Sequence, residues 1–498
     1  MPTPEMPEAP AAPPPGFAAR LTEAARLHQA GDLADSERCY CDLLCDRPAA
    51  AEIAPLYAVL LHQSGRLDDA RTWAQRGTVL RPHSAPHLAT YGHLLLDQNR
   101  LDEAIAPLQR ALSCDPNAVA SYNNLAIALN HVDQDTAILV GTDDATVASW
   151  TAICRERLVQ DPTDLAALVR LGPLLERQGQ PDRALRVYQH TLRLRPEHSR
   201  SYSRAALLRL RAAWGPPPAP APRDDRPAIT LSSLGDNGRF GNQLIQYGFL
   251  RCFAAEHDLR AETADWIGRD LFDLDEPIVE PGPPGTRRPE LTPAALSAAQ
   301  QAAGTPWIRI ADHDLSGLFA DQVPYFARHQ ALLQRVLKPG HRAATLLEPA
   351  LERLRAGGAL VALHLRRGDA VRFPTQHPFH RHFWVAPEAW YLSWLHKLWA
   401  ALPRPVLYIA SDQPGIEETF AAFSPRTARD LQVDIPGAAF YPDFFMLSRA
   451  DIVIGANSTF STVAALLNER AVLFLRPDAA AGELVPYQPT QHSLLPGI

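Results

Sequence analysis

The sequence predicts two kinds of structure in one chain, an α-helical solenoid over residues 16–212 and an α/β region over residues 228–480. Prolines recur at 34-residue intervals through the first part. A proline-rich stretch at residues 213–227 is typical of an extended, semi-rigid linker. Beyond it, short apolar runs alternate with helical patterns, which indicates parallel strands and helices in layers. We therefore expect an α plus α/β protein whose halves separate at the linker.

Helix pairs in the first part follow from regularly spaced proline, glycine and alanine. A glycine stands 17 residues before the proline in three of five units, and an alanine stands 12 residues before it in three. This is the tetratricopeptide period, with a small residue at the helix contact and a proline after the second helix. One interval is 46 residues long, so we expect 12 extra residues within 131–145. The prolines are Pro48, Pro82, Pro116, Pro162 and Pro196.

Stacked helix pairs form a curved solenoid whose concave face is the usual binding surface. We expect a protein partner there, because nothing in residues 16–212 resembles a phosphate-binding loop. Part of a terminal capping helix is expected at residues 204–213. Residues 1–15 are expected to be a disordered leader, since they lack the basic and apolar regions of a secretion signal. Residues 481–498 are expected to form a C-terminal tail.

Six apolar runs in the second part have the length of strands, and helical patterns at residues 325–337 and 387–402 lie between some of them. Parallel strands present ligand-binding groups at their carboxyl ends. The residues that follow these strands are therefore the first place to look for a site. The runs span residues 229–234, 307–311, 359–365, 406–411, 451–455 and 471–475.

Polar side chains follow the run at residues 359–365 in the sequence HLRRGD. Arg366 and Arg367 suit a diphosphate, because guanidinium groups stay charged and bind phosphate oxygens in pairs. Asp369 can orient an arginine or face a sugar hydroxyl. An arginine pair at an ordinary surface turn is the alternative.

A glycine-rich loop precedes an expected helix that opens near Gln243. Gly235, Gly238 and Gly241 recur at every third residue, so the backbone can approach a ligand closely. This spacing differs from the dinucleotide pattern GxGxxG, which argues against a nicotinamide cofactor. The amides of Asn242 and Gln243 can bind sugar hydroxyls or phosphate. A flexible turn between strand and helix is the alternative.

Small polar residues cluster again after the run at residues 451–455. Asn457, Ser458, Thr459 and Ser461 stand at the start of an expected helix, where free backbone amides favour an anion. The alternative is helix capping, for which serine and threonine are favoured residues.

Together, GRFGNQ (238–243), HLRRGD (364–369) and NSTFS (457–461) resemble the three ordered blocks of the α-1,2-fucosyltransferase family, relatives of the α-1,6-fucosyltransferases. The resemblance covers roughly residues 229–476, about half of the chain. It implies two facing Rossmann-like lobes of the GT-B type, with the second lobe beginning near Ala359. It also implies an inverting, metal-independent transfer of L-fucose from GDP-fucose to a glycan or glycoprotein hydroxyl.

The resemblance assigns roles to individual residues. Arg366 takes the position that contacts the diphosphate, and His364 that of a donor-binding histidine. Arg367 and Asp369 support the loop and lie beside the donor. Asp443 matches a carboxylate that helps to hold the donor, although it can equally be a helix cap.

The sequence does not identify the catalytic base. The α-1,6 relatives place a glutamate shortly after the arginine pair, where this chain has AVRFPTQ and no carboxylate. His377 is a candidate base. It can instead be structural, or join His380 and His382 at a metal. This chain also differs from the family at Thr462-Val463, where the family has a tryptophan pair. The identity of the acceptor is therefore not settled by the resemblance.

Two other functions fit the same residues. One is a GT-B transferase that uses another nucleotide sugar on a protein acceptor, and the other is a non-catalytic repeat scaffold with a degenerate transferase fold. No cofactor beyond the donor substrate is expected. The acidic pair Asp273 and Asp275 lies in a proline-rich, loop-like segment, so we expect no metal there.

Composition narrows the classes of partner and compartment. A net charge of −7 gives no reason to expect nucleic acid or an anionic membrane. Six cysteines without a CxxC pair indicate reduced thiols and a cytoplasmic protein. Cys39, Cys41 and Cys45 fit small core positions better than a metal site. No apolar run reaches the roughly 18 residues of a membrane span, which leaves peripheral association through an acceptor or partner.

Overall fold

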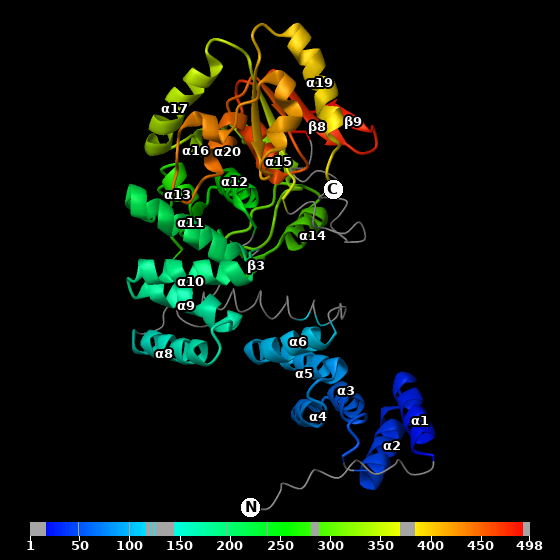
Figure 1. Ribbon diagram of the computed structural model, residues 1–498. Coiled ribbons are helices and arrows are strands. Elements are labelled where there is room, and N and C mark those ends of the chain that lie inside the picture. The colour runs from blue at the N-terminus through cyan, green and yellow to red at the C-terminus, as the bar shows by residue number, and fades with distance from the viewer. Residues whose placement is uncertain are drawn as a thin grey trace, which may run out of the picture. The chain divides into compact units, whose positions relative to one another are not determined.

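The computed structural model describes residues 16–47, 49–98, 100–115, 121, 124, 144–196, 198–236, 238–279, 288–368 and 384–491 (Figure 1). Its chain forms two compact units, Met1–Thr136 and Ala137–Ile498, which are described separately below. The expected leader and residues 131–143, which hold most of the expected insertion, lie outside the described residues. No helix among the described residues is both long enough and apolar enough to cross a membrane.

The first unit consists of helix pairs, as the repeat period predicts. Gly31 and Gly65 lie in the turn inside a pair with φ of 82° and 76°, a conformation that favours glycine. Ala70 and Ala104 are fully buried, which confirms the small residue at the helix contact. The pairs are α1 (Phe17–Gln29) with α2 (Leu33–Asp46), α3 (Ala54–Gln63) with α4 (Leu67–Leu80), and α5 (Ala85–Asp97) with α6 (Leu101–Cys114).

The second unit begins with four more helices of the same kind and continues into the α/β region (Figure 1). The last of them is longer than the expected capping helix and belongs to a different core. Its residues Ala206, Leu207 and Leu210 are buried in the core that the two sheets share. The helices are α8 (Asp144–Gln160), α9 (Leu165–Arg177), α10 (Pro181–Leu194) and α11 (Ser199–Trp214).

Two separate sheets follow. The first is parallel throughout, with the order β2 (Arg260–Thr263), β1 (Ala228–Leu231), β4 (His313–Leu315) and β3 (Glu290–Leu291). The second has the order β6 (Val406–Ser411), β5 (Leu360–Leu365), β7 (Ile452–Ile454), β8 (Leu473–Asp478) and β9 (Glu483–Pro486), and only β9 is antiparallel. Leu365 pairs with Ser411, so β5 and β6 end at the same edge.

One hydrophobic core joins the two sheets. Ile229 of β1 and Ala362 of β5 both belong to it, whereas Val361 and Leu363 of β5 face a second core with α19. Both faces of β5 are therefore buried, which explains its continuous apolar sequence. The helices and 3-10 helices of the region are α12 (Phe240–Glu256), α13 (Gly268–Leu271), α14 (Pro293–Ala303), α15 (Val323–Arg328), α16 (Gln330–Val336), α17 (His341–Arg355), α19 (Glu388–Ala401), η3 (Ile416–Phe423), η4 (Ala428–Leu431), α20 (Tyr441–Leu447) and α21 (Thr459–Leu467).

Most expected strands are present, with some corrections. Residues 307–311 do not form a strand. Asp312 has a φ of 58°, and this left-handed residue interrupts the extended chain before β4 begins at His313. The expected helix at 325–337 is divided at His329 into α15 and α16. The sequence analysis missed β2, β3 and β9, and β9 lies in the expected tail.

The proline-rich stretch does not divide two independent halves, so that expectation was wrong. Inside it, the amide of Ala221 donates to the carbonyl of Asp275 at 2.6 Å, and Arg223 pairs with Glu262 at 3.1 Å. Helix α11, which precedes the proline-rich stretch, packs closely against Gly437. A Cβ added to Gly437 would lie 2.1 Å from the carbonyl oxygen of Ala206 in α11. Proline content predicts an extended backbone, but it does not show whether that backbone is packed against a neighbour.

Candidate functional site

The first and last sequence blocks meet where α12 and α21 begin. The hydroxyl of Thr459 donates to the Oδ1 atom of Asn242 at 2.8 Å, across 217 positions of sequence. A Cβ on Gly241 would lie 2.6 Å from the backbone nitrogen of Phe460. Gly241 is therefore required for the close approach of two helix starts rather than for a turn.

The end of β5 joins this contact through aromatic rings. The ring of His364 lies 5.3 Å from that of Phe460, between centroids. Phe444 of α20 lies 5.4 Å from Phe460 and 5.3 Å from Phe240. All three sequence blocks and α20 thus converge at the carboxyl end of the second sheet, and we call this cluster the junction site.

Two buried side chains at the junction site each have one polar atom that makes no hydrogen bond to a described residue. His364 is 8% exposed, and its Nδ1 atom makes no hydrogen bond to a described residue. Asn457 is 6% exposed, and its Nδ2 atom is likewise unpaired within the described chain. Unpaired buried polar groups are costly, so both are suited to a ligand or to ordered water.

Burial also fixes the charge of His364. It lowers the pKa of the imidazole to about 4, and the nearby Asp412 opposes this effect only in part. The ring is therefore neutral near pH 7, with one nitrogen able to donate and the other able to accept a hydrogen bond.

The two arginines after β5 have different surroundings. Arg367 is buried, and its Nη2 atom donates to Glu388 at 2.9 Å and to the carbonyl of Ala386 at 3.2 Å. Its backbone amide donates to Asp412 at 2.7 Å. Arg367 therefore supports the loop. Arg366 is partly exposed at the strand end and is the arginine better placed to meet a ligand.

Asp412 is the loop residue that the sequence analysis did not single out. Its carboxylate also approaches Gly368, where an added Cβ would lie 2.5 Å from Oδ2. The sequence contained the information needed to find it. Asp412 directly follows β6, and neighbouring parallel strands end at one edge of the sheet.

Asp443 lies in the first turn of α20 and accepts a hydrogen bond from the hydroxyl of Tyr408 at 2.7 Å. Burial raises the pKa of this carboxyl to about 7, and the Tyr408 hydrogen bond offsets only part of the effect. Asp443 does not cap its helix through a side-chain hydrogen bond, since the cap position is Phe440.

The serines of the last block stabilise their own loop. Ser458 is the N-cap of α21, and its hydroxyl accepts from the amide of Phe460 at 3.3 Å. Ser461 accepts from the amide of Ala456 at 3.2 Å. Helix capping, one of the two open interpretations, is thus confirmed for Ser458.

Gln243 is committed elsewhere. Its side-chain nitrogen donates to Ser203 of α11 at 2.9 Å and to the carbonyl of Gly238 at 3.1 Å, and the residue is 2% exposed. Both amide hydrogens are therefore used in packing, so its assignment as a ligand-binding residue stays a prediction for the carbonyl oxygen alone. Asp369, His377, His380 and His382 lie outside the described residues.

Helix α11 holds the glycine-rich loop at further points. Arg200 pairs with Asp236 at 3.3 Å, and the guanidinium of Arg239 lies 5.8 Å from the ring centre of Tyr202. Helix α11 therefore helps to position the glycine-rich loop.

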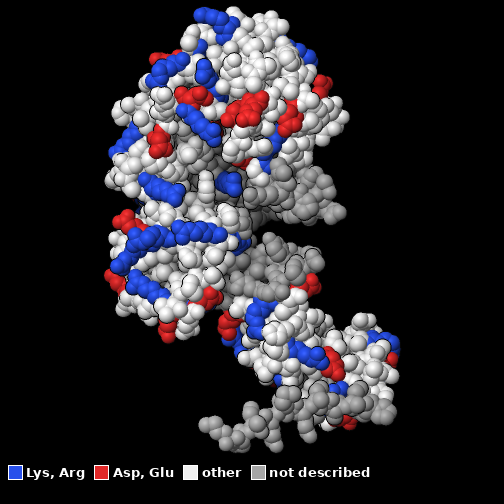
Figure 2. Space-filling model, in the orientation of Figure 1, with Lys and Arg blue, Asp and Glu red and all other residues white. Residues whose placement is uncertain are grey.

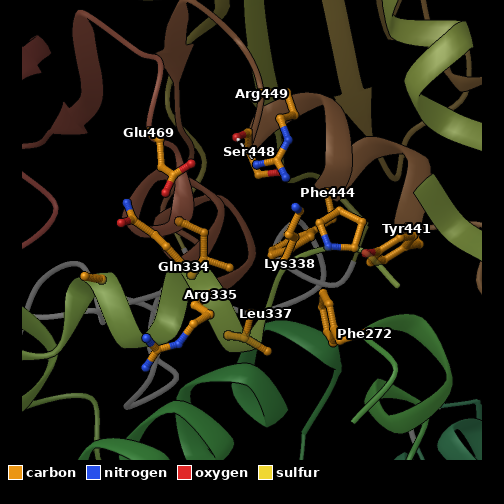
Figure 3. A pocket seen from close by; sticks show the side chains of 13 residues that line it. Phe272, Gln334, Arg335, Leu337, Lys338, Tyr441, Phe444, Ser448, Arg449 and Glu469 are labelled. Carbon is orange, nitrogen blue, oxygen red and sulfur yellow. Dashed lines mark hydrogen bonds between the residues drawn. The ribbon is translucent and has the colours of Figure 1, made fainter. Parts of the chain in front are cut away.

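No group of three or more potential metal-ligating side chains gathers within the described residues. The carboxylate of Asp273 instead accepts from the amide of His341 at 2.6 Å. A cavity of about 290 Å³ lies apart from the strand ends, beside α16, α20 and the C-terminal end of α21 (Figure 3).

Comparisons with known proteins concern the helical part. A family model described as tetratricopeptide repeat matches residues 21–85, and another described as TPR repeat matches residues 92–130. The N-terminal part therefore consists of tetratricopeptide repeats, followed by a region of sheets and helices. No curated protein matches the chain.

Solved structures of repeat domains are also similar. The first TPR of Spaghetti (RPAP3) bound to an HSP90 peptide is 15% identical, covers 23% of this chain and 92% of its own, and gives a TM-score of 0.23. The Sgt2 TPR domain from Aspergillus fumigatus is 18% identical over 25% of this chain and 83% of its own, with a TM-score of 0.24. Pseudomonas aeruginosa PilF is 18% identical over 40% of this chain and 83% of its own, with a TM-score of 0.23.

Proposed function

We propose that the α/β region is an inverting glycosyltransferase of the GT-B type, which transfers L-fucose from GDP-fucose to a glycan hydroxyl. The observation that carries the proposal is the convergence of three distant sequence blocks at the junction site. Blocks that merely shaped turns would have no reason to meet across two sheets, whereas ligand-binding blocks must meet.

The residues of the junction site fit the needs of such a donor. Departing GDP develops negative charge, which the cationic Arg366 and the amides at the start of α21 can stabilise. Neutral His364 and the unpaired Nδ2 atom of Asn457 offer hydrogen bonds to the nucleotide or the sugar. Inversion also needs a base that takes the acceptor proton, and His377 stays the candidate.

A panel of nucleotide sugars tests this function. Titration calorimetry of the full chain with GDP-fucose, GDP-mannose, UDP-glucose and UDP-N-acetylglucosamine should show GDP-fucose binding most tightly, with slow hydrolysis of the donor. Tighter binding of a UDP-sugar would favour a transferase with another donor. Binding of none by a folded protein would favour the scaffold.

Donor binding should survive removal of divalent ions, because fixed cations serve the diphosphate in this proposal. The titration is repeated in excess EDTA, and the affinity for GDP-fucose should change by less than about twofold. Loss of binding in EDTA, restored by manganese or magnesium, would contradict the metal-independent part of the proposal.

A second function, partner binding, is favoured by a groove of about 560 Å³ on α8, α9 and α10. Four apolar side chains line it, and its charged lining residues are cationic. Basic side chains gather in a band over α10 (Figure 2). We propose that this groove binds an acidic peptide segment of a partner protein. The lining residues are Leu168, Leu171, Leu175, Val187, Arg155, Arg183, Arg186 and His190.

Fluorescence anisotropy with labelled pentaglutamate and pentalysine tests the groove. Pentaglutamate should bind more tightly, and Arg183→Glu with Arg186→Glu should weaken it at least tenfold. Arg193→Glu is the matched control, because Arg193 is an exposed arginine of α10 outside the groove. Equal losses in the control and the double variant would indicate unspecific charge attraction.

A further inference from the structure

The cavity of about 290 Å³ in Figure 3 belongs to neither proposed function. It lies where four segments meet: α13 with Phe272, the end of α16 with the following loop, α20, and the C-terminal end of α21. The junction site lies at the opposite end of α21. Nine helical residues separate the two ends by about 12 Å. The cavity and the junction site therefore lie at opposite ends of α21, although Phe444 belongs to both.

Two cations converge on this cavity without a carboxylate between them. Figure 3 shows the ammonium end of Lys338 and the guanidinium of Arg449 directed toward the same part of the space, whereas the guanidinium of Arg335 points outward at the rim. Glu469 also lines the cavity, yet no ion pair joins it to these cations within the described chain. Lys338 is exposed, and the Nη1 atom of Arg449 donates to the carbonyl of Ser448 at 3.3 Å. The remaining N–H groups of both cations can bind an anion.

Three aromatic side chains also contribute to the wall. Phe272, Tyr441 and Phe444 line the cavity, and all three are at least 95% buried. Aromatic walls favour a flat ring, which stacks on them or meets their edges. The volume lies near the lower end of the range for small-molecule sites and is small for a nucleotide sugar.

The cavity is held open by its own framework. The amide of Gly340 donates to the carbonyl of Leu271 at 2.8 Å, and Asp273 accepts from the amide of His341 at 2.6 Å. These bonds fix the loop that carries Lys338. On the other side, Arg355 donates to the carbonyl of Arg449 at 2.5 Å. Preformed sites lose little ordering entropy when they bind.

We propose that this cavity, which we call the ring–cation pocket, binds a small phosphate monoester that carries an aromatic ring. The phosphate lies between Lys338 and Arg449, and the ring lies against Phe272, Tyr441 and Phe444. Arginine and lysine are both suited to phosphate, the first through paired hydrogen bonds and the second as a compact charge.

The composition of the chain allows a selective test. Lys338 and Lys397 are the only lysines. Pyridoxal 5′-phosphate carries a ring, a phosphate and an aldehyde, which condenses with a lysine amine and releases water. Borohydride then delivers hydride to the C=N bond and leaves a stable secondary amine. Peptide mapping by mass spectrometry measures the label at each lysine separately.

Lys397 is the matched control. It is exposed and lies 4.8 Å from the ring centre of Trp394, but it does not line the ring–cation pocket. At substoichiometric reagent, Lys338 should receive at least five times more label than Lys397. Phenyl phosphate should protect Lys338, whereas phenol should not. Equal labelling of the two lysines, or failure of phenyl phosphate to protect, would overturn the proposal.

Two variants locate the phosphate. Arg449→Gln should raise the phenyl phosphate concentration for half-protection at least tenfold, whereas Arg335→Gln at the rim should change it less than threefold. Wild-type protection in a folded Arg449→Gln protein would contradict the proposed position of the phosphate. Protection of Lys338 by GDP-fucose as strong as that by phenyl phosphate would show that the pocket is not a separate site.

Discussion

Arg366 and Arg367 are adjacent in sequence, yet they should respond differently to the same substitution. Lysine cannot reproduce the planar fork of a guanidinium on a diphosphate. We expect Arg366→Lys to lower turnover with GDP-fucose at least tens of times, since such contacts contribute about 2–4 kcal/mol at the transition state. Its melting temperature should fall less than that of Arg367→Lys.

Arg367→Lys should mainly lower the melting temperature, because it breaks a buried contact with Glu388 and the carbonyl of Ala386. Initial rates and thermal melts of the two variants, measured in parallel, give the comparison. Wild-type transfer by a folded Arg366→Lys protein would remove the main physical reason for the proposed transferase.

Asp443 should make stability depend on pH. The folded state raises the pKa of its carboxyl from 3.8 to about 7, so folding favours the protonated form. The stabilising effect of the proton is fully present below about pH 4, and it is lost as the pH rises to 7. Asp443→Asn lacks this titration. Its melting temperature should therefore exceed that of the wild type at pH 8, and the difference should vanish near pH 4.

Differential scanning fluorimetry from pH 4 to pH 8 measures this difference, and each unit of pKa shift corresponds to about 1.4 kcal/mol. Tyr408→Phe is a useful companion, because it removes the hydrogen bond that partly stabilises the carboxylate. That variant should lose stability at pH 8 more than at pH 5. A pH-independent difference between Asp443→Asn and the wild type would show that Asp443 has an ordinary pKa.

Residue types and strand ends led to Arg366 and Asn457 without the structure, because parallel strands carry their ligand-binding groups at the carboxyl end. His364 was named through the family resemblance. The different tasks of the two arginines could not be predicted. They depend on Glu388 and Asp412, which lie on other elements and are brought to the loop only by tertiary packing.

Among the elements, the contact between α12 and α21 makes a clear prediction about glycine. Gly241→Ala would place its Cβ 2.6 Å from the backbone nitrogen of Phe460, which cannot move as a side chain can. Overpacking of this kind costs about 1–3 kcal/mol. Chemical denaturation measures the change, and GDP-fucose affinity should fall with it because the junction site is displaced.

Gly248→Ala is the matched control on the same helix. Its Cβ would lie 3.3 Å from the ring of Phe326, a side-chain contact that needs a shift of only a few tenths of an ångström. Alanine also favours a helix by about 1 kcal/mol over glycine. Its effect on stability should therefore be small. If both glycine variants lost the same stability, the close helix approach would not be the cause.

The glycine spacing correctly indicated a close approach at Gly241, but the group that approaches in the structure is the start of α21 and not a ligand. The sequence pattern indicates a backbone that something approaches closely, but it does not say whether a ligand or another helix does so. Strand prediction had a similar limit. The run Val406–Ser411 was confirmed residue by residue, whereas the two-residue strand β3 is too short to leave a pattern.

For the whole molecule, the packing of α11 predicts which fragments fold. A fragment of residues 216–498 loses Leu207 and Leu210, and each buried leucine contributes about 2–5 kcal/mol. It also loses the pairing of Arg211 with Asp265 and Asp270. We expect this fragment to be insoluble or to melt far below the full chain.

A fragment of residues 137–498 keeps α11 and should fold, with a circular dichroism melt close to that of the α/β region in the full chain. It should also keep the affinity for GDP-fucose. A stable, donor-binding fragment of residues 216–498 would contradict the role given to α11.

The shared core also has a consequence for how the protein is made. Leu207 belongs to the same core as Ala438 and Tyr487, residues that are synthesised more than 200 positions later. Ribosomes release the N-terminal part first, so the apolar face of α11 waits for its partners until nearly the entire chain has emerged. Long-range closure of this kind is slow. Newly made chains should therefore depend on chaperones that shield α11 during synthesis.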